Sequence, residues 1–121
     1  HAAAVMVSNQ IVALADMGTA LLVKCGFSEA AAAEALSPLL LGNAQSVAEK
    51  GAVNALTGPI ERGDAQTVSK HLQEIRKFAV ESTVGQDILT AYTALSKQLI
   101  RIAQQKHPQK DYKHLEKELE Q

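Results

Sequence analysis

The sequence is poor in the residues that several classes of functional site require. Its 121 residues include one cysteine, Cys25, no tryptophan and only 3% aromatic residues. A single cysteine excludes an internal disulfide. With few rings to stack on bases and a formal net charge of -1, the chain also has no broad positive field that would attract phosphates. Nucleic acid is therefore not expected as a partner.

Catalytic and metal-binding motifs are missing as well. The sequence contains no CxxC, HExxH, GxSxG or GxGxxG pattern, and its histidines fall on different predicted elements: His1, His71, His107 and His114. We therefore expect neither a self-contained active site nor a bound metal. Cys25 has two interpretations, a reactive thiol and a small buried hydrophobic residue near a helix end. We favour the second, because only Lys24 lies nearby to lower the pKa of the thiol.

The longest apolar stretch covers residues 2–25 and is interrupted at a few polar positions, Ser8, Asn9, Gln10 and Asp16. A charged residue at the centre of a bilayer costs about 2.5–3.5 kcal/mol on insertion scales. We therefore interpret the stretch as a buried helix, in the middle of a bundle or in a subunit interface, and not as a membrane span. The chain begins without methionine and without a leader pattern, so we expect a cytoplasmic piece of a longer protein.

The sequence predicts an all-α fold. Alanine, the strongest helix former, is abundant, and no segment alternates apolar and polar residues as a half-buried strand would. We predict a single domain over residues 1–121, a compact multi-helix structure with a long central first helix. Residues 109–121 are expected to add a surface helix that contacts the body through Tyr112, Leu115 and Leu119. The other predicted helices cover residues 2–25, 28–36, 37–50, 65–78 and 86–106.

Glycine and proline mark the predicted ends of these helices. Gly26 is expected to close the first helix and Gly51 the third, and the dipeptide Ser37-Pro38 is expected to separate the second from the third. Two glycines and a proline within residues 57–64 predict an ordered loop without regular structure. Asp64 is expected to cap the helix that follows, and residues 81–85 to form the next connection.

A first group of candidate site residues lies at the start of the first helix. At 100° per residue, Ser8 lies within about 20° of His1 around the helix, and Asn9 lies about 80° from His1. These polar groups could share a concave surface. The alternative is that Ser8 and Asn9 hydrogen-bond the backbone of a neighbouring loop, and that His1 is foreign to the natural chain.

A second group lies in the predicted loop and the helix after it. Glycine permits close approach of the backbone, proline stiffens it, and the planar guanidinium of Arg62 suits a carboxylate or a phosphate. Thr67 and His71 are four residues apart and share a helix face. The alternative is structural: Asp64 is a helix cap, Thr67 is a first-turn hydroxyl, and Arg62 pairs with a surface carboxylate.

Two segments together resemble a known family. They are the N-terminal run His1-Ala2-Ala3-Ala4-Val5-Met6-Val7-Ser8-Asn9, and the run from Leu56 to Asp64 followed by Thr67-Val68 and His71-Leu72. They resemble the C-terminal helical domain of unknown function (domain of unknown function 2520) that follows a Rossmann-like domain in proteins regarded as NADP-dependent oxidoreductases. The resemblance extends to about Ile102. A tyrosine usually precedes the HAAA run in that family, whereas this chain begins at the histidine.

The resemblance implies a fold similar to the C-terminal domains of 6-phosphogluconate dehydrogenase and ketopantoate reductase. In those relatives the first helix enters the substrate cleft, and a lysine and an asparagine on it serve hydride transfer. No lysine follows that pattern here, because Lys24 lies at the far end of the helix. The resemblance therefore offers His1 and Asn9 as catalytic candidates and a set of substrate-binding candidates: Ser8, Thr57, Gly58, Pro59, Arg62 and His71.

Three functions are compatible with the sequence. The first is the substrate and dimerisation domain of an oxidoreductase whose absent Rossmann domain binds NADP or NAD, so that the fragment itself binds no cofactor and is inactive. The second is a free-standing helical interaction module without catalysis. The third is a nucleotide sensor that acts through dimer geometry. All three predict a homodimer, because the first helix is apolar on many faces.

Overall fold

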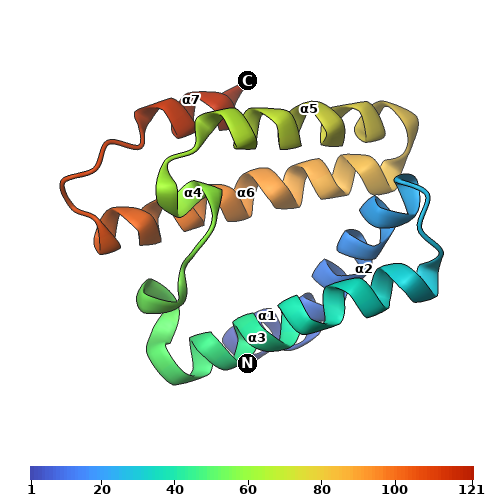
Figure 1. The fold of residues 1–121 in the computed structure, drawn as a ribbon, viewed down its shortest axis with the longest axis horizontal. Coiled ribbons are helices and arrows are strands. Elements are labelled where there is room, and N and C mark those ends of the chain that lie inside the picture. Colours follow the sequence, from blue (N-terminus) through green and yellow to red (C-terminus); the bar gives the residue numbers. More distant parts are fainter. The chain divides into compact units, whose positions relative to one another are not determined.

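The computed structural model describes all residues, 1–121, and contains α-helices and no strand, which confirms the all-α prediction. Contacts divide the chain into two compact units, His1–Ala48 and Glu49–Gln121. The prediction of a single domain stays a prediction. Figure 1 labels the helices, which are α1 (Ala2–Val7), α2 (Asn9–Lys24), α3 (Glu29–Ala55), α4 (Pro59–Arg62), α5 (Ala65–Glu81), α6 (Thr83–Lys106) and α7 (Lys113–Glu120).

The helix predicted over residues 2–25 is present, with an interruption at Ser8 that the sequence analysis missed. Ser8 has φ -124° and ψ -77°, outside the helical region, and separates α1 from α2. Its hydroxyl donates to the carbonyl oxygen of Ala4 at 2.5 Å. A serine that bonds the carbonyl four residues earlier bends a helix. Gly26, with φ 102°, follows the end of α2 as predicted.

The predicted break at Ser37-Pro38 is wrong, because α3 continues through Pro38. Proline removes one backbone hydrogen bond inside a helix, but Pro38 and the preceding turn at Glu34 are exposed, so water can satisfy the freed carbonyl. The predicted N-cap at Ser28 is confirmed by a bond from the Ala31 amide to its hydroxyl at 3.1 Å. Helical geometry is interrupted at Gly51, where φ is 79° and ψ is 167°, as the sequence predicted.

The N-terminal unit has almost no buried core. Ala32 is its only buried residue, and neither α1 nor α2 has one. Burial of residues 2–25 in the middle of a bundle is therefore wrong, whereas their burial in a subunit interface stays a prediction; Cys25 is exposed in the chain, not buried as predicted. Large apolar side chains are exposed instead: Met6, Val7, Val12, Leu14, Val23, Phe27, Leu39, Leu40, Leu41 and Val47.

Residues Ala2–Lys24 are long and apolar enough to cross a membrane, judged by length and composition alone. None of this stretch is buried within the structure. One such helix near an N-terminus is weak evidence for a membrane span, because signal sequences and the core helices of soluble proteins have the same length and apolar composition.

The C-terminal unit is built around one hydrophobic cluster. Figure 1 shows α5 and α6 side by side, with α7 packed near the start of α5. The predicted apolar stripe of α5 is confirmed, since Val68, Leu72 and Ile75 are buried. The predicted contacts of the tail are confirmed as well, since Tyr112, Leu115 and Leu119 are buried. The cluster consists of Leu56, Ile60, Val68, Leu72, Ile100, Ala103, Tyr112, Leu115 and Leu119.

The turn between α5 and α6 is tighter than predicted, because Ser82 alone separates the two helices. The Ser82 hydroxyl caps α6 by accepting a hydrogen bond from the Gly85 amide at 3.0 Å. Gly85 is buried, and a Cβ at this position would lie 2.3 Å from the carbonyl oxygen of Phe78. The absence of a side chain at Gly85 therefore allows the two helix ends to approach this closely.

We expect Gly85→Ala to lower the free energy of unfolding by about 1–3 kcal/mol, the usual cost of overpacking, because backbone atoms of α5 would have to move. Gly42→Ala is the matched control: it lies in α3 with open space around it, and the better helix former should raise stability by up to about 1 kcal/mol. Urea unfolding followed by circular dichroism measures both. Equal unfolding midpoints for Gly85→Ala and the parent chain would contradict the close approach of the α5 and α6 ends at Gly85.

Candidate functional site

Residues 56–64, here called the motif loop, contain regular structure that the sequence analysis excluded. Pro59–Arg62 form the single helical turn α4, which begins after Gly58 and ends at Gly63. Gly58 has φ 100° and Gly63 has φ 75°. Side chains rarely adopt these values, so the two glycines allow a helical turn to fit between two sharp bends. The prediction of a loop without regular structure is therefore wrong.

Side chains from the C-terminal end of the chain hold the backbone of the motif loop. The ammonium groups of Lys106 and Lys110 donate to the carbonyl oxygens of Leu56 at 2.8 Å and Arg62 at 2.6 Å. The hydroxyl of buried Tyr112 donates to the carbonyl oxygen of Glu61 at 2.8 Å. We call residues 106–120 the strap. Three carbonyls of one short loop thus receive donors from the strap, which fixes the conformation of the loop.

A hydrogen bond between His107 and Glu61 adds to this attachment. Nε2 of His107 lies 2.6 Å from Oε1 of Glu61, and the side chains are 39% and 20% exposed. The pKa of the Glu61 carboxyl is lowered, first by the hydrogen bond from His107, against partial burial, and then by the positive charges of Lys106, His107 and Lys110. Sequence reasoning missed this pair, because the partners lie 46 residues apart and neither belongs to a motif.

Asp64 caps α5 as predicted. Its carboxylate accepts from the backbone amide of Thr67 at 3.0 Å and from the Thr67 hydroxyl at 2.7 Å. These bonds lower the pKa of the Asp64 carboxyl, against partial burial, and the charges of Arg62 and Lys70 lower it further. The structural alternative for Asp64 and Thr67 is thereby confirmed. Arg62 is exposed and forms no ion pair of its own.

His71 forms a polar contact between α5 and α6. Its Nδ1 lies 2.9 Å from the hydroxyl oxygen of Tyr92, and the two rings meet edge to face at 6.0 Å. Burial raises the pKa of the Tyr92 hydroxyl, while a hydrogen bond with Ser96 opposes this shift. Ser96 is itself buried. Nothing in the sequence indicated Tyr92 or Ser96, because both lie on a helix predicted only from its apolar stripe.

The structure brings some of the predicted site residues together. Ser8 and Asn9 are neighbours at the break between α1 and α2, where the Ser8 hydroxyl lies 3.4 Å from the Asn9 side-chain oxygen. Both are exposed, and the main partner of Ser8 is a carbonyl of its own helix, not the loop backbone of the alternative interpretation. His1 is exposed at the start of α1 and makes no side-chain cap.

Other predicted site residues remain apart. Gly58, Pro59 and Arg62 belong to the same helical turn, with Thr57 exposed just before it. His71 lies seven residues beyond the Asp64 cap, about 10 Å along α5 at the usual helical rise, and contacts Tyr92 instead. No group of three or more His, Cys, Asp and Glu side chains is arranged to hold a metal ion.

Comparison with known proteins places this helical architecture and its motif loop in one family. The model of the domain of unknown function DUF2520 matches residues 1–99, so the chain belongs to this family. No curated protein and no solved structure matches the chain. The matched residues include both motif segments and end inside α6, before the strap.

The lowered pKa of Glu61 predicts a specific loss of stability in acid. A carboxyl group whose pKa falls on folding contributes stability above its unfolded pKa, about 4.3, and this contribution is lost as the pH falls through the lower folded value. We expect Glu61→Gln to weaken attachment of the strap at neutral pH. The variant should also lose less of that attachment in acid than the parent chain does. Hydrogen exchange of residues 113–120, measured from neutral pH to about pH 3 and corrected for intrinsic rates, reports this attachment.

Glu74→Gln is the matched control for this measurement. Glu74 pairs with Lys77 at 2.7 Å, but both side chains are about 70% exposed, and exposed pairs contribute little to stability. Glu74→Gln should leave the hydrogen-exchange rates of residues 113–120 unchanged at every pH. If the parent and Glu61→Gln lose protection in acid to the same extent, Glu61 does not hold the strap.

Proposed function

We propose that this chain is the C-terminal substrate-cleft and dimerisation domain of an NAD(P)-dependent oxidoreductase. In this proposal a preceding Rossmann domain binds NADP or NAD, and the helical domain alone is inactive. The substrate is a small molecule, the assembly is a homodimer located in the cytoplasm, and neither nucleic acid nor a membrane is a partner. Membership of the DUF2520 family supports the proposal together with the resemblance of the two motif segments to domains that follow a Rossmann domain.

The exposed apolar surface of the N-terminal unit is the observation that carries the proposal. Met6, Val7 and Val12 from α1 and α2, and Leu39 and Leu41 from α3, are each between 59% and 72% exposed. Soluble monomers rarely expose large contiguous apolar patches, and a stable interface buries about 800 Å² on each partner. A second copy of the chain and a preceding Rossmann domain would together supply such cover.

The proposed chemistry uses the polar groups at the start of the unit. Asn9 stands exposed at the first position of α2, where its side-chain nitrogen could orient a substrate oxygen, and His1 is the only ionisable side chain that precedes it in the chain. An imidazole suits proton transfer to or from a hydroxyl or carbonyl near neutral pH. Arg62 on α4 is the candidate for an anionic group of the substrate.

A free-standing helical interaction module is the second candidate function. It is favoured by a specific observation within the C-terminal unit: the polar side chains pair with one another and do not converge on a common point. Asp64 is bonded to Thr67, Glu61 to His107 and His71 to Tyr92. The same apolar surface would then bind a protein partner without catalysis.

Charged substitutions on α3 test the dimer. We expect the parent chain to show about twice its mass of 12.9 kDa in light scattering. Leu39→Glu and Leu41→Glu should raise the dissociation constant at least about tenfold, because each would bury an unpaired carboxylate in the interface. Both residues are exposed within their unit, at 63% and 67%, so the substitutions should not unfold the monomer.

Val80→Glu is the matched control, because Val80 on α5 is 88% exposed and carries the same change of charge. It should leave the dissociation constant unchanged. A parent chain that is monomeric at the highest soluble concentration would contradict the dimer, as would equal effects of Val80→Glu and Leu41→Glu.

The native polypeptide distinguishes the two functions. We expect intact mass spectrometry of the endogenous protein to give a mass larger than 12.9 kDa by a dinucleotide-binding domain of about 100–200 residues. That polypeptide should quench or shift NADPH fluorescence on binding, whereas the helical chain alone should not. A native protein that begins near His1, or a longer one that binds neither NADPH nor NADH, would contradict the oxidoreductase and favour the interaction module.

A further inference from the structure

We propose that α4 and its surroundings form a binding site for a phosphate group, made by Arg62, Lys70 and Lys110 around the bend at Gly63. Sequence reasoning identified Arg62 alone as a group that could bind an anion. The structure adds one cation from α5 and one from the strap. Neither had been assigned a role, and Lys110 lies beyond the residues that the family model matches.

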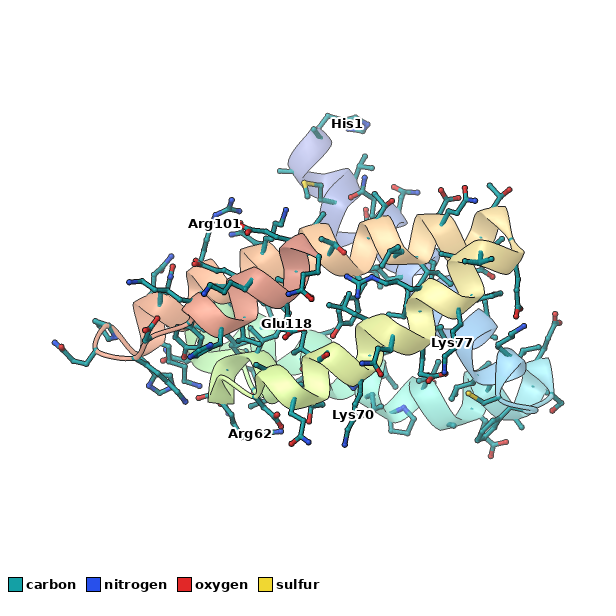
Figure 2. The ribbon with its side chains drawn as sticks, turned by 90° about the horizontal axis from the view of Figure 1, so that it is seen from above. His1, Arg62, Lys70, Lys77, Arg101 and Glu118 are labelled. Atoms are coloured by element: carbon teal, nitrogen blue, oxygen red, sulfur yellow. The ribbon has the colours of Figure 1, made fainter.

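Arg62 and Lys70 lie on one edge of the C-terminal unit. Figure 2 shows both side chains extending from that edge, away from the helices, while Arg101 extends from the opposite edge. Both residues are exposed, and both are close enough to Asp64 for their charges to lower the pKa of its carboxyl, after the larger effect of Thr67. Neither forms an ion pair, so the two cations are available to an outside anion.

Lys110 is held beside the same bend by several contacts. Its ammonium nitrogen lies 2.6 Å from the Arg62 carbonyl oxygen and 5.9 Å from the centre of the Tyr112 ring. Its Cε lies 3.3 Å from the point where a Cβ of Gly63 would be. A lysine ammonium has three donors, and the Arg62 carbonyl uses one, so two remain for a ligand.

Two carboxylates that these cations influence already accept hydrogen bonds within the chain. Asp64 accepts two hydrogen bonds from Thr67, and Glu61 accepts one from His107. They offset part of the positive charge and still leave the donors of Arg62, Lys70 and Lys110 without an acid partner. The chain as a whole has a formal net charge of -1, so the attraction for an anion is local to this edge and not a property of the whole molecule.

The number and type of cations favour phosphate over a single carboxylate. A phosphate monoester carries about 1.5 to 2 negative charges at neutral pH and offers three acceptor oxygens, which three separate donors can share. A guanidinium also matches phosphate geometry with two parallel hydrogen bonds. This site shares Arg62 with the proposed substrate site and extends that proposal by two lysines and a ligand class, but it requires neither a Rossmann domain nor a dimer.

Inorganic phosphate is the probe. We expect it to shift the backbone amide signals of residues 62–64 and the Arg62 side-chain signal in nuclear magnetic resonance spectra, saturating at millimolar concentration. Sodium chloride at matched ionic strength and sodium acetate serve as comparisons. Neither should produce a saturable shift, since chloride is weakly bound and acetate carries one charge. Saturation by acetate at the same concentration would show a general carboxylate site and overturn the assignment to phosphate.

Arg62→Gln and Lys70→Gln should each weaken phosphate binding about tenfold, the loss expected from one charge-assisted hydrogen bond. Lys110→Gln should do the same, but it also disturbs the strap, so Lys70→Gln, whose side chain makes no protein hydrogen bond, is the stricter test. Arg101→Gln on the opposite edge is the matched control and should leave binding unchanged. No saturable shift in the parent chain, or equal effects of Arg62→Gln and Arg101→Gln, would overturn the site. Both results leave the dimer and NADPH measurements unaffected.

Discussion

Burial of apolar side chains from two distant segments is the constraint on which the C-terminal unit depends. Leu56 and Ile60 pack in one cluster with Leu115 and Leu119, so the motif loop and the end of the chain share a core. Each fully buried leucine or isoleucine contributes about 1.5–3 kcal/mol relative to an exposed one. Directional bonds then fix the loop, because Lys106 at the end of α6, and Lys110 and Tyr112 just before α7, donate to carbonyl oxygens of the loop. The position of Arg62 is thus a consequence of packing farther along the chain.

The N-terminal unit follows the opposite principle. Its helices form readily because they are rich in alanine, but alanine buries little area, and Ala32 is the sole residue fully covered. Helix propensity alone rarely stabilises a tertiary structure, since most helical stability in proteins comes from a packed apolar face. The large side chains that could supply that face point to solvent within the unit. The unit therefore gains little stability from apolar burial within itself.

Local signals in the sequence predicted the helices well and the site poorly. Gly26, Gly51, Ser28 and Asp64 mark helix ends through short-range chemistry, and the structure confirms each. Pro38 misled the prediction, because its cost depends on exposure, which the local sequence does not reveal. The pairs Glu61–His107 and His71–Tyr92 could not be predicted, because they join residues that only the packing of α5, α6 and the strap brings together. Helix type is a local property, whereas a site is made by tertiary contacts.

The end of the family match inside α6 has a consequence for where this domain is divided. A fragment that stopped at residue 99 would keep the recognisable motifs and lose Ile100, Ala103, Tyr112, Leu115 and Leu119 from the cluster. It would also leave the carbonyls of Leu56, Glu61 and Arg62 without their donors. The range that identifies the family is therefore smaller than the range that folds. A boundary drawn by sequence similarity would cut through the hydrophobic core.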